Sequence, residues 1–285
     1  MFHDCSKYIR DWLLKQPHVK EESLTDWLLF EISQKNPAIY YKAFSRYEES
    51  LNGADWEWWI LTSESTSTTC SNSFSAYRFL VQAKKLLNDG KDNYPYLHYG
   101  NKNGLQIDLL TRKAKLCNAF PLYMYYSATE PEIKEQMKNL HFVDKATLSW
   151  CSNCLNGCFL SNAYDVYDLL FSGGRKHLVD TELLNRSYKL SLLDKVFEYT
   201  INSRDDLLTI FNNKIVEHLN SDKNSVSHSA QGIYGIKHKG KGIPSYLSIF
   251  VKQHNVSLDW FEAEMRHTLP DVDGIGVIDL RDKII

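Results

Sequence analysis

Four polar side chains, held in two short apolar stretches, are of the types that bind metal ions and handle phosphate groups. They are Asp55, Glu57, Gln82 and Lys84. The two stretches, residues 53–60 and 78–84, are rich in aromatic and aliphatic residues and contain no proline, which predicts β-strands. Because most residues between them, 63–73, are small and polar, we expect a hairpin loop there.

Side-chain alternation decides which of these groups can meet. Successive side chains of a strand point to opposite faces, so Asp55 and Glu57 share one face of the first strand, and Gln82 and Lys84 share one face of the second. Antiparallel pairing would bring an acid, an amide oxygen and an amine into one small volume. Mg²⁺ prefers oxygen ligands in octahedral geometry, and we expect Asp55 and the Gln82 oxygen to bind Mg²⁺ or Mn²⁺. Lys84 would position the attacking water or hold the phosphate.

A purely structural explanation competes with this one. The tryptophans and Ile60 of the first strand would fill a core, while Asp55 and Glu57 would lie on its solvated edge. A Gln-x-Lys pattern also arises by chance. The two explanations differ in whether the polar groups of the two strands point toward one another.

Gly-x-Asp, a variable hairpin and then Gln-x-Lys resemble the motif of the PD-(D/E)xK superfamily, the restriction-endonuclease-like nucleases, in the variant where Gln replaces the second acid. The order of elements is similar as well: an acid-bearing helix over 24–32, the two strands, a helix over 106–117 and a strand over 121–126. The resemblance covers residues 20–130 and implies an α/β fold with an α-β-β-α-β core around a central mixed sheet flanked by helices. The sequence departs from the motif at Ala54, where a proline usually precedes the first acid.

The resemblance implies a nuclease that hydrolyses phosphodiester bonds of DNA or RNA, with DNA favoured. Asp55 and Gln82 would hold Mg²⁺ or Mn²⁺, Lys84 would stabilise charge, and Glu31 or Glu57 would complete the shell. The pattern GADWEWW…QAK is also similar to a bacterial domain family of uncharacterised function. Nucleases of this kind resemble effectors of bacterial anti-phage defence. The alternative is a catalytically inactive module of the same fold that binds nucleic acid or a protein partner.

The role of Glu31 depends on the helix that carries it. We expect this helix to begin near Ser23 or Thr25, either of which is a suitable N-cap. Glu31 stands seven residues after Leu24, so it lies on or beside the buried stripe. There it is either a satisfied carboxylate at the edge of the core or a neighbour of the metal site.

The chain has 285 residues, of which 43% are hydrophobic, so it can bury a large core. We expect a nuclease-like core over residues 1–135 and a helix-rich elaboration over 136–285, which returns a strand near 276–280 to the sheet. Other elements predicted in the second part are helices over 161–171 and 181–193 and a strand over 246–251.

The formal net charge of −2 gives no overall attraction to nucleic acid, so binding would need a local basic face. The candidates for phosphate contacts are Lys85, Lys237, Lys239 and Lys241. The last three belong to a Gly- and Lys-rich segment, residues 235–242, for which an ordinary solvated loop is an equal explanation.

Three cysteines form the one local cluster: Cys151, Cys154 and Cys158. Zinc binding requires a fourth ligand, and His177 is the nearest candidate, so buried reduced thiols are the favoured explanation. The polar N-terminus and the absence of an apolar run of about 18 residues predict a cytoplasmic protein without a membrane segment. A homo-oligomer and a partner protein of a defence system both stay open.

Overall fold

The computed structural model describes residues 1–43, 53–63, 74–87, 92–129, 155–171, 174, 176–194, 238–239, 244, 246–247 and 272–281 of the chain. Their helices are α1 (Phe2–Lys15), α2 (Glu21–Lys35), α3 (Tyr94–Leu97), α4 (Gln106–Leu116), α7 (Ala163–Phe171) and α8 (Asp180–Asn185), with a 3-10 helix at Leu190–Leu193. None of these helices is both long enough and apolar enough to cross a bilayer.

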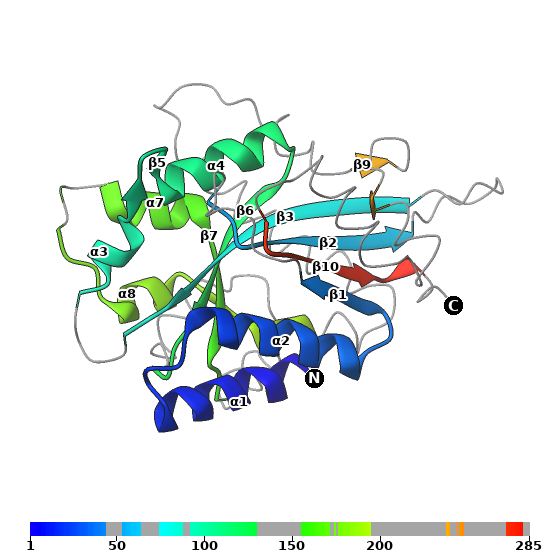
Figure 1. Cartoon of the computed structure of the whole chain (residues 1–285), viewed down its shortest axis with the longest axis horizontal. Helices are drawn as coiled ribbons and strands as arrows, with labels where there is room; N and C mark the ends of the chain where they lie inside the picture. Colours follow the sequence, from blue (N-terminus) through cyan, green and yellow to red (C-terminus); the bar gives the residue numbers. More distant parts are fainter. Residues whose placement is uncertain are drawn as a thin grey trace, which may run out of the picture.

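One mixed sheet forms the centre of the molecule (Figure 1). Its strands are β1 (Ile39–Ala43), β2 (Trp56–Ser63), β3 (Phe74–Lys85), β6 (Phe120–Tyr126), β7 (Cys158–Asn162), β8 (Tyr188–Lys189), β9 (His238–Lys239) and β10 (Gly274–Asp279). Seven strands follow the order β1-β10-β2-β3-β6-β7-β8, and β9 pairs with β3. A separate two-stranded sheet joins β4 (Gly100–Asn101) and β5 (Gly104–Leu105).

The sheet is mixed because its neighbours pair in both directions. The predicted hairpin is present: β2 and β3 are antiparallel, with Trp56 opposite Val81. β3 and β6 are parallel, which α4 permits by crossing between them. The last strand, β10, inserts between β1 and β2 and runs parallel to β2. The strand expected near residues 276–280 therefore lies inside the sheet rather than at its edge.

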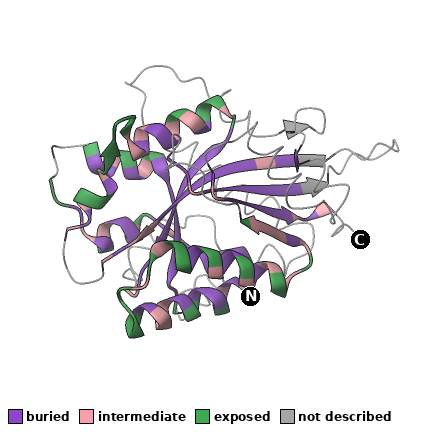
Figure 2. Ribbon diagram, in the orientation of Figure 1, coloured by how far each residue is buried: buried purple, intermediate pink, exposed green. Residues whose placement is uncertain are grey.

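Helices cover both faces of the sheet, so both sets of alternating side chains are buried (Figure 2). On one face, Trp56 and Trp58 of β2 pack with apolar residues of α1 and α2. On the other face, Trp59 and Leu61 pack with apolar residues of α4, α7 and α8. The predicted α/β class, with a central mixed sheet flanked by helices, is confirmed. The restriction-endonuclease-like identity of its core stays a prediction.

Several boundaries differ from those predicted. α2 begins at Glu21, because Glu21 and Glu22 suit the positive end of the helix dipole, and Thr25 lies inside the helix with its hydroxyl donating to the Glu21 carbonyl. Residues 161–162 extend β7 because they pair with β6. The helix predicted over 181–193 is divided into α8, β8 and the 3-10 helix.

One predicted strand is wrong where it can be checked. Tyr246 and Leu247 are helical, and both are buried in the core on the α4 side of the sheet. An apolar run of this length does not by itself separate a strand from a buried helical turn. The remainder of the predicted strand, residues 248–251, lies outside the described residues.

Candidate functional site

The site lies at the fork where β3 continues beyond the start of β2. β2 pairs with β3 only as far as Val81, whereas residues 82–85 of β3 pair with β6 alone. Asp55, the residue before β2, occupies this fork, and its amide donates to the Val81 carbonyl at 2.9 Å. The Asp55 carboxylate turns toward β3, where Oδ2 accepts hydrogen bonds from Gln82 Nε2 at 2.6 Å and from the Ala83 amide at 2.7 Å.

Asp55 is therefore in contact with Gln82, as the strand alternation predicts. Burial raises the pKa of the Asp55 carboxyl to about 6, although the charge of Lys84 and the Ala83 amide both favour the ionised form. Lys84 is half-buried and lies close enough for its charge to act on Asp55. The fork thus holds a carboxylate that accepts a hydrogen bond from an amide and is influenced by the charge of an ammonium group.

A second carboxylate reaches the fork from the first turn of α2. The Glu21 side chain accepts a hydrogen bond from the Lys85 amide through Oε2 at 2.6 Å. Burial raises the pKa of Glu21 to about 7, the charge of Lys84 opposes this rise, and the charge of Asp55 adds to it. The charge of Lys84 thus favours the ionised form of both Asp55 and Glu21, whereas the charge of Asp55 disfavours the ionised form of Glu21.

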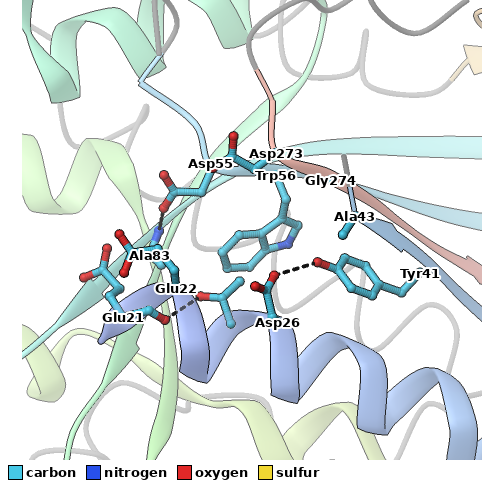
Figure 3. Close-up of a pocket in the computed structure, with 11 residues that line it drawn as sticks. Glu21, Glu22, Asp26, Tyr41, Ala43, Asp55, Trp56, Ala83, Asp273 and Gly274 are labelled. Carbon is cyan, nitrogen blue, oxygen red and sulfur yellow. Dashed lines mark hydrogen bonds between the residues drawn. The ribbon is translucent and has the colours of Figure 1, made fainter. Parts of the chain in front are cut away.

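An open cavity of about 200 Å³ extends from the fork over the indole of Trp56 (Figure 3). Its wall contains five acids, which are Glu21, Glu22, Asp26, Asp55 and Asp273. Asp273 immediately precedes β10, and its amide donates to the Asp55 carbonyl at 2.7 Å. At the far end of the cavity, the Tyr41 hydroxyl donates to Asp26 Oδ1 at 3.1 Å. So many carboxylates in one cavity repel anions unless a cation is present.

The structure does not bring Glu31 to this cavity. Glu31 lies ten residues after Glu21 on α2, which is about 15 Å along the helix axis. Its carboxylate forms an ion pair with Lys35 at 3.2 Å. The acid of α2 that reaches the fork is Glu21, which accepts from the Lys85 amide. Sequence analysis passed over Glu21 because the helix was expected to begin two to four residues later.

Glu57 is also kept away from the cavity. Two residues along a strand span about 6.6 Å, and this carries Glu57 from the fork into the interior, where it is fully buried. There it accepts hydrogen bonds from Arg78 Nε and from the Tyr246 hydroxyl, the latter at 2.8 Å. Glu57 therefore belongs to a buried ion pair on the α4 side of the sheet.

The lysine candidates are divided by the structure. The Lys85 ammonium donates to the carbonyls of Pro17 at 2.9 Å and Val19 at 2.8 Å, so it holds the loop between α1 and α2. Lys239 lies in β9, with its backbone opposite Ser75. Lys237 and Lys241 lie outside the described residues.

The cysteine cluster is only partly described. Cys158 is buried in β7, and burial raises the pKa of its thiol. The ring of His177, the suggested fourth ligand, contacts Asp92 through Nδ1 at 2.8 Å. Cys151 and Cys154 lie outside the described residues. Within the described ranges, no three His, Cys, Asp or Glu side chains gather closely enough to hold a metal ion.

A metal at the fork would therefore need side-chain amide or backbone carbonyl oxygens as ligands in addition to carboxylates. The carboxylates of Asp55 and Glu21, the Gln82 amide and the Ala83 carbonyl are hard oxygen donors, and Mg²⁺ usually takes one or two carboxylates and keeps several waters. Gln82 Oε1 is buried without a hydrogen-bond partner among the described residues, since the amide nitrogen faces Asp55. A divalent cation would also offset the cost of two neighbouring buried charges. The residues present fit Mg²⁺ or Mn²⁺.

We expect Mn²⁺ affinity to fall about 100-fold between pH 8 and pH 5.5. Protons compete with the metal for carboxyls whose pKa values are about 6 and about 7, for Asp55 and Glu21 respectively, and both are ionised at pH 8. Isothermal titration with Mn²⁺ at several pH values measures this. The variant Glu21→Gln should show a shallower dependence, and an affinity that does not change with pH would contradict a site made of these two acids.

Sequence analysis predicted only Asp55 among the five acids of the cavity, and two of the four that it missed, Glu21 and Asp273, were missed for different reasons. Glu21 has a local signal, because acids concentrate in the first turn of a helix. Asp273 has none, because its place beside Asp55 depends on the insertion of β10 between β1 and β2. No property of residues 272–281 alone predicts which strands β10 will pair with.

Fold and site together define an α/β protein with an acid-lined cavity at the fork of two central strands. A profile for a family of unknown function, DUF6615, matches residues 1–196, and the chain belongs to this family. No curated protein and no solved structure matches the chain. The matched region includes Glu21, Asp55, Gln82 and Lys84, whereas Asp273 and β10 lie beyond it.

Proposed function

We propose that the protein is a metal-dependent nuclease that hydrolyses phosphodiester bonds, with DNA favoured over RNA. The observation that supports this most is the convergence of Asp55, Gln82 and Lys84 at the fork, joined by Glu21 from α2. A bound Mg²⁺ or Mn²⁺ would neutralise charge on the phosphoryl group and make a bound water easier to deprotonate. A role as an effector of anti-phage defence stays a prediction from resemblance.

The chain's own residues would have separate tasks. Asp55 is held in place by Gln82 Nε2 and the Ala83 amide, so its position is defined before any ligand binds. Lys84 supplies positive charge beside two acids and would hold a scissile phosphate there. Because the cavity is lined by acids, we infer that nucleic acid binds strongly only when a divalent cation is present.

One observation favours the second candidate, an inactive binding module of the same fold. Gln82 stands where a second acid would add a charge for the metal, and its amide nitrogen, rather than its oxygen, faces Asp55. An amide binds a cation less strongly than a carboxylate does, since it carries no net charge. Such a module would bind nucleic acid or a protein partner without cleaving it.

The test is cleavage of plasmid DNA, single-stranded DNA and RNA with Mg²⁺, with Mn²⁺ and with a chelator. We expect divalent-dependent cleavage by the wild type, a loss of about 100-fold in Glu21→Gln and no change in Glu31→Gln. The two variants make the same chemical change on one helix, but only Glu21 reaches the fork. Absence of cleavage with every substrate and ion would support the binding module, and equal losses in the two variants would reject Glu21 as a ligand.

A further inference from the structure

Gly53, two residues before Asp55, lies directly against the backbone of α4. A Cβ atom at this position would lie 2.4 Å from the Gln106 carbonyl oxygen and 2.8 Å from the Leu110 amide nitrogen. Real Cβ atoms do not approach backbone atoms so closely, and the backbone of a helix cannot turn aside as a flexible side chain can. The φ angle of Gly53 is also +71°, a conformation that favours glycine. The steric contact and the backbone conformation therefore both favour glycine at position 53.

This contact matters because the backbone of Asp55 is already fixed on two other sides. Its amide donates to the Val81 carbonyl of β3 at 2.9 Å, and its carbonyl accepts from the Asp273 amide at 2.7 Å. The segment 53–55 thus contacts α4, β3 and Asp273, the residue before β10. With its backbone set in this way, the Asp55 carboxylate reaches Gln82 and Ala83 at hydrogen-bonding distance.

We propose that Gly53 is a positioning residue of the site, and that its close contact with α4 sets the place of the Asp55 carboxylate. The expected effect of Gly53 on metal affinity rests on the proposed function. Its expected effect on the position of the Asp55 carboxylate does not. Any side chain at position 53 must move the segment away from α4 or change its φ angle, and either movement displaces Asp55. Metal ligands tolerate a displacement of only about 0.2 Å, so a small shift has a large effect.

Three glycine-to-alanine variants separate positioning from general destabilisation. At Gly157, the residue before β7, a Cβ would lie 2.4 Å from the Arg10 amide nitrogen of α1, as close a contact as at Gly53. At Gly174, φ is +63° and no atom of the described residues lies within 4 Å of an added Cβ. Gly157→Ala therefore reproduces the steric conflict of Gly53→Ala at a position outside the segment that carries Asp55. Gly174→Ala reproduces the substitution of a glycine with positive φ, also outside that segment.

Two measurements are made on the folded fraction of each variant: titration of the Asp55 carboxyl by NMR and Mn²⁺ affinity by calorimetry. We expect Gly53→Ala to lower Mn²⁺ affinity at least tenfold and to move the Asp55 titration midpoint toward that of an exposed aspartate. Gly157→Ala should lose stability while the Asp55 titration midpoint and the Mn²⁺ affinity stay at their wild-type values. Gly174→Ala should also leave the titration midpoint and the Mn²⁺ affinity unchanged.

Ala54→Gly is a milder variant for the case in which Gly53→Ala does not fold. It adds backbone freedom beside Asp55 without a steric conflict, and we expect a smaller change of the same sign in both readouts. The proposal is overturned if the folded variants at positions 53 and 54 show the same Asp55 titration midpoint as the wild type. A wild type that neither binds Mn²⁺ nor cleaves nucleic acid overturns the proposed function instead, and the Asp55 titration still decides the role of Gly53.

Discussion

Asp55→Asn is expected to lower divalent-dependent cleavage by about 10³-fold or more while the protein stays folded. Asparagine keeps the shape of the side chain but removes the charge that a cation requires. It also replaces one carboxylate oxygen with an amino group, so the acceptor shared by Gln82 and Ala83 is weakened. The measurement is the initial rate of cleavage with Mg²⁺ and with Mn²⁺.

The same substitution should raise the free energy of unfolding at pH 8 by about 1–2 kcal/mol, allowing for the partial exposure of the side chain. The sign follows from the pKa of Asp55, which burial raises to about 6. The folded protein binds more protons than the unfolded chain between about pH 4 and pH 6, so the wild type loses stability as pH rises through this window. At pH 4, where the folded carboxyl is protonated, the gain should disappear.

Asp26→Asn is the matched control for Asp55→Asn. Asp26 belongs to the same cavity but lies at its exposed end beside Tyr41, so we expect less than a tenfold change in cleavage. Cleavage lost together with stability gained at pH 8 separates a chemical role from unfolding. Full activity in Asp55→Asn, or a loss of equal size in Asp26→Asn, would reject the assignment of Asp55.

Arg78→Met is expected to destabilise the protein by about 3–5 kcal/mol. Arg78 donates to the buried carboxylate of Glu57, to the Cys117 carbonyl at 3.1 Å and to the Tyr246 hydroxyl at 3.3 Å. Glu57 and Arg78 are 0% and 6% exposed, so removing the guanidinium leaves a negative charge that water cannot reach. Methionine fills much of the volume, so the expected loss is electrostatic rather than a cavity effect.

Urea denaturation of Arg78→Met measures this loss, and the double variant Glu57→Gln/Arg78→Met is its control. Without the carboxylate there is no isolated charge, so we expect the double variant to recover at least half of the lost stability. The single variant should also gain stability as pH falls, because burial already raises the pKa of Glu57 and the loss of Arg78 raises it further. A loss below about 1 kcal/mol would mean that the ion pair contributes little.

The Arg78 network also connects two parts of the chain. Glu57 and Arg78 lie within the region matched by the family profile, whereas Tyr246 lies beyond it. The hydroxyl of Tyr246 contacts both carboxylate oxygens of Glu57, at 2.8 and 3.0 Å. The region beyond residue 196 therefore contributes to the buried centre of the sheet through Tyr246 as well as through β10.

The sequence by itself determined the parts of the site that depend on local periodicity. Alternation along two neighbouring strands predicted that Asp55 would meet Gln82, and the structure brings them within 2.6 Å. The apolar spacing of residues 106–117 predicted α4, and the continuous apolar run over 121–126 predicted β6. These predictions succeed because each uses interactions among residues that are close in the chain.

Only the tertiary structure decided which acids join Asp55. Glu57 has the predicted alternation, yet the strand carries it into the interior beside Arg78 and Tyr246. Glu21 replaces Glu31 because the packing of α2 on the sheet places its first turn, rather than its third, at the fork. Asp273 arrives with β10 from more than 200 residues away in the chain. The pairing of distant strands and the docking of a helix depend on the complete sheet, so no local pattern contains them.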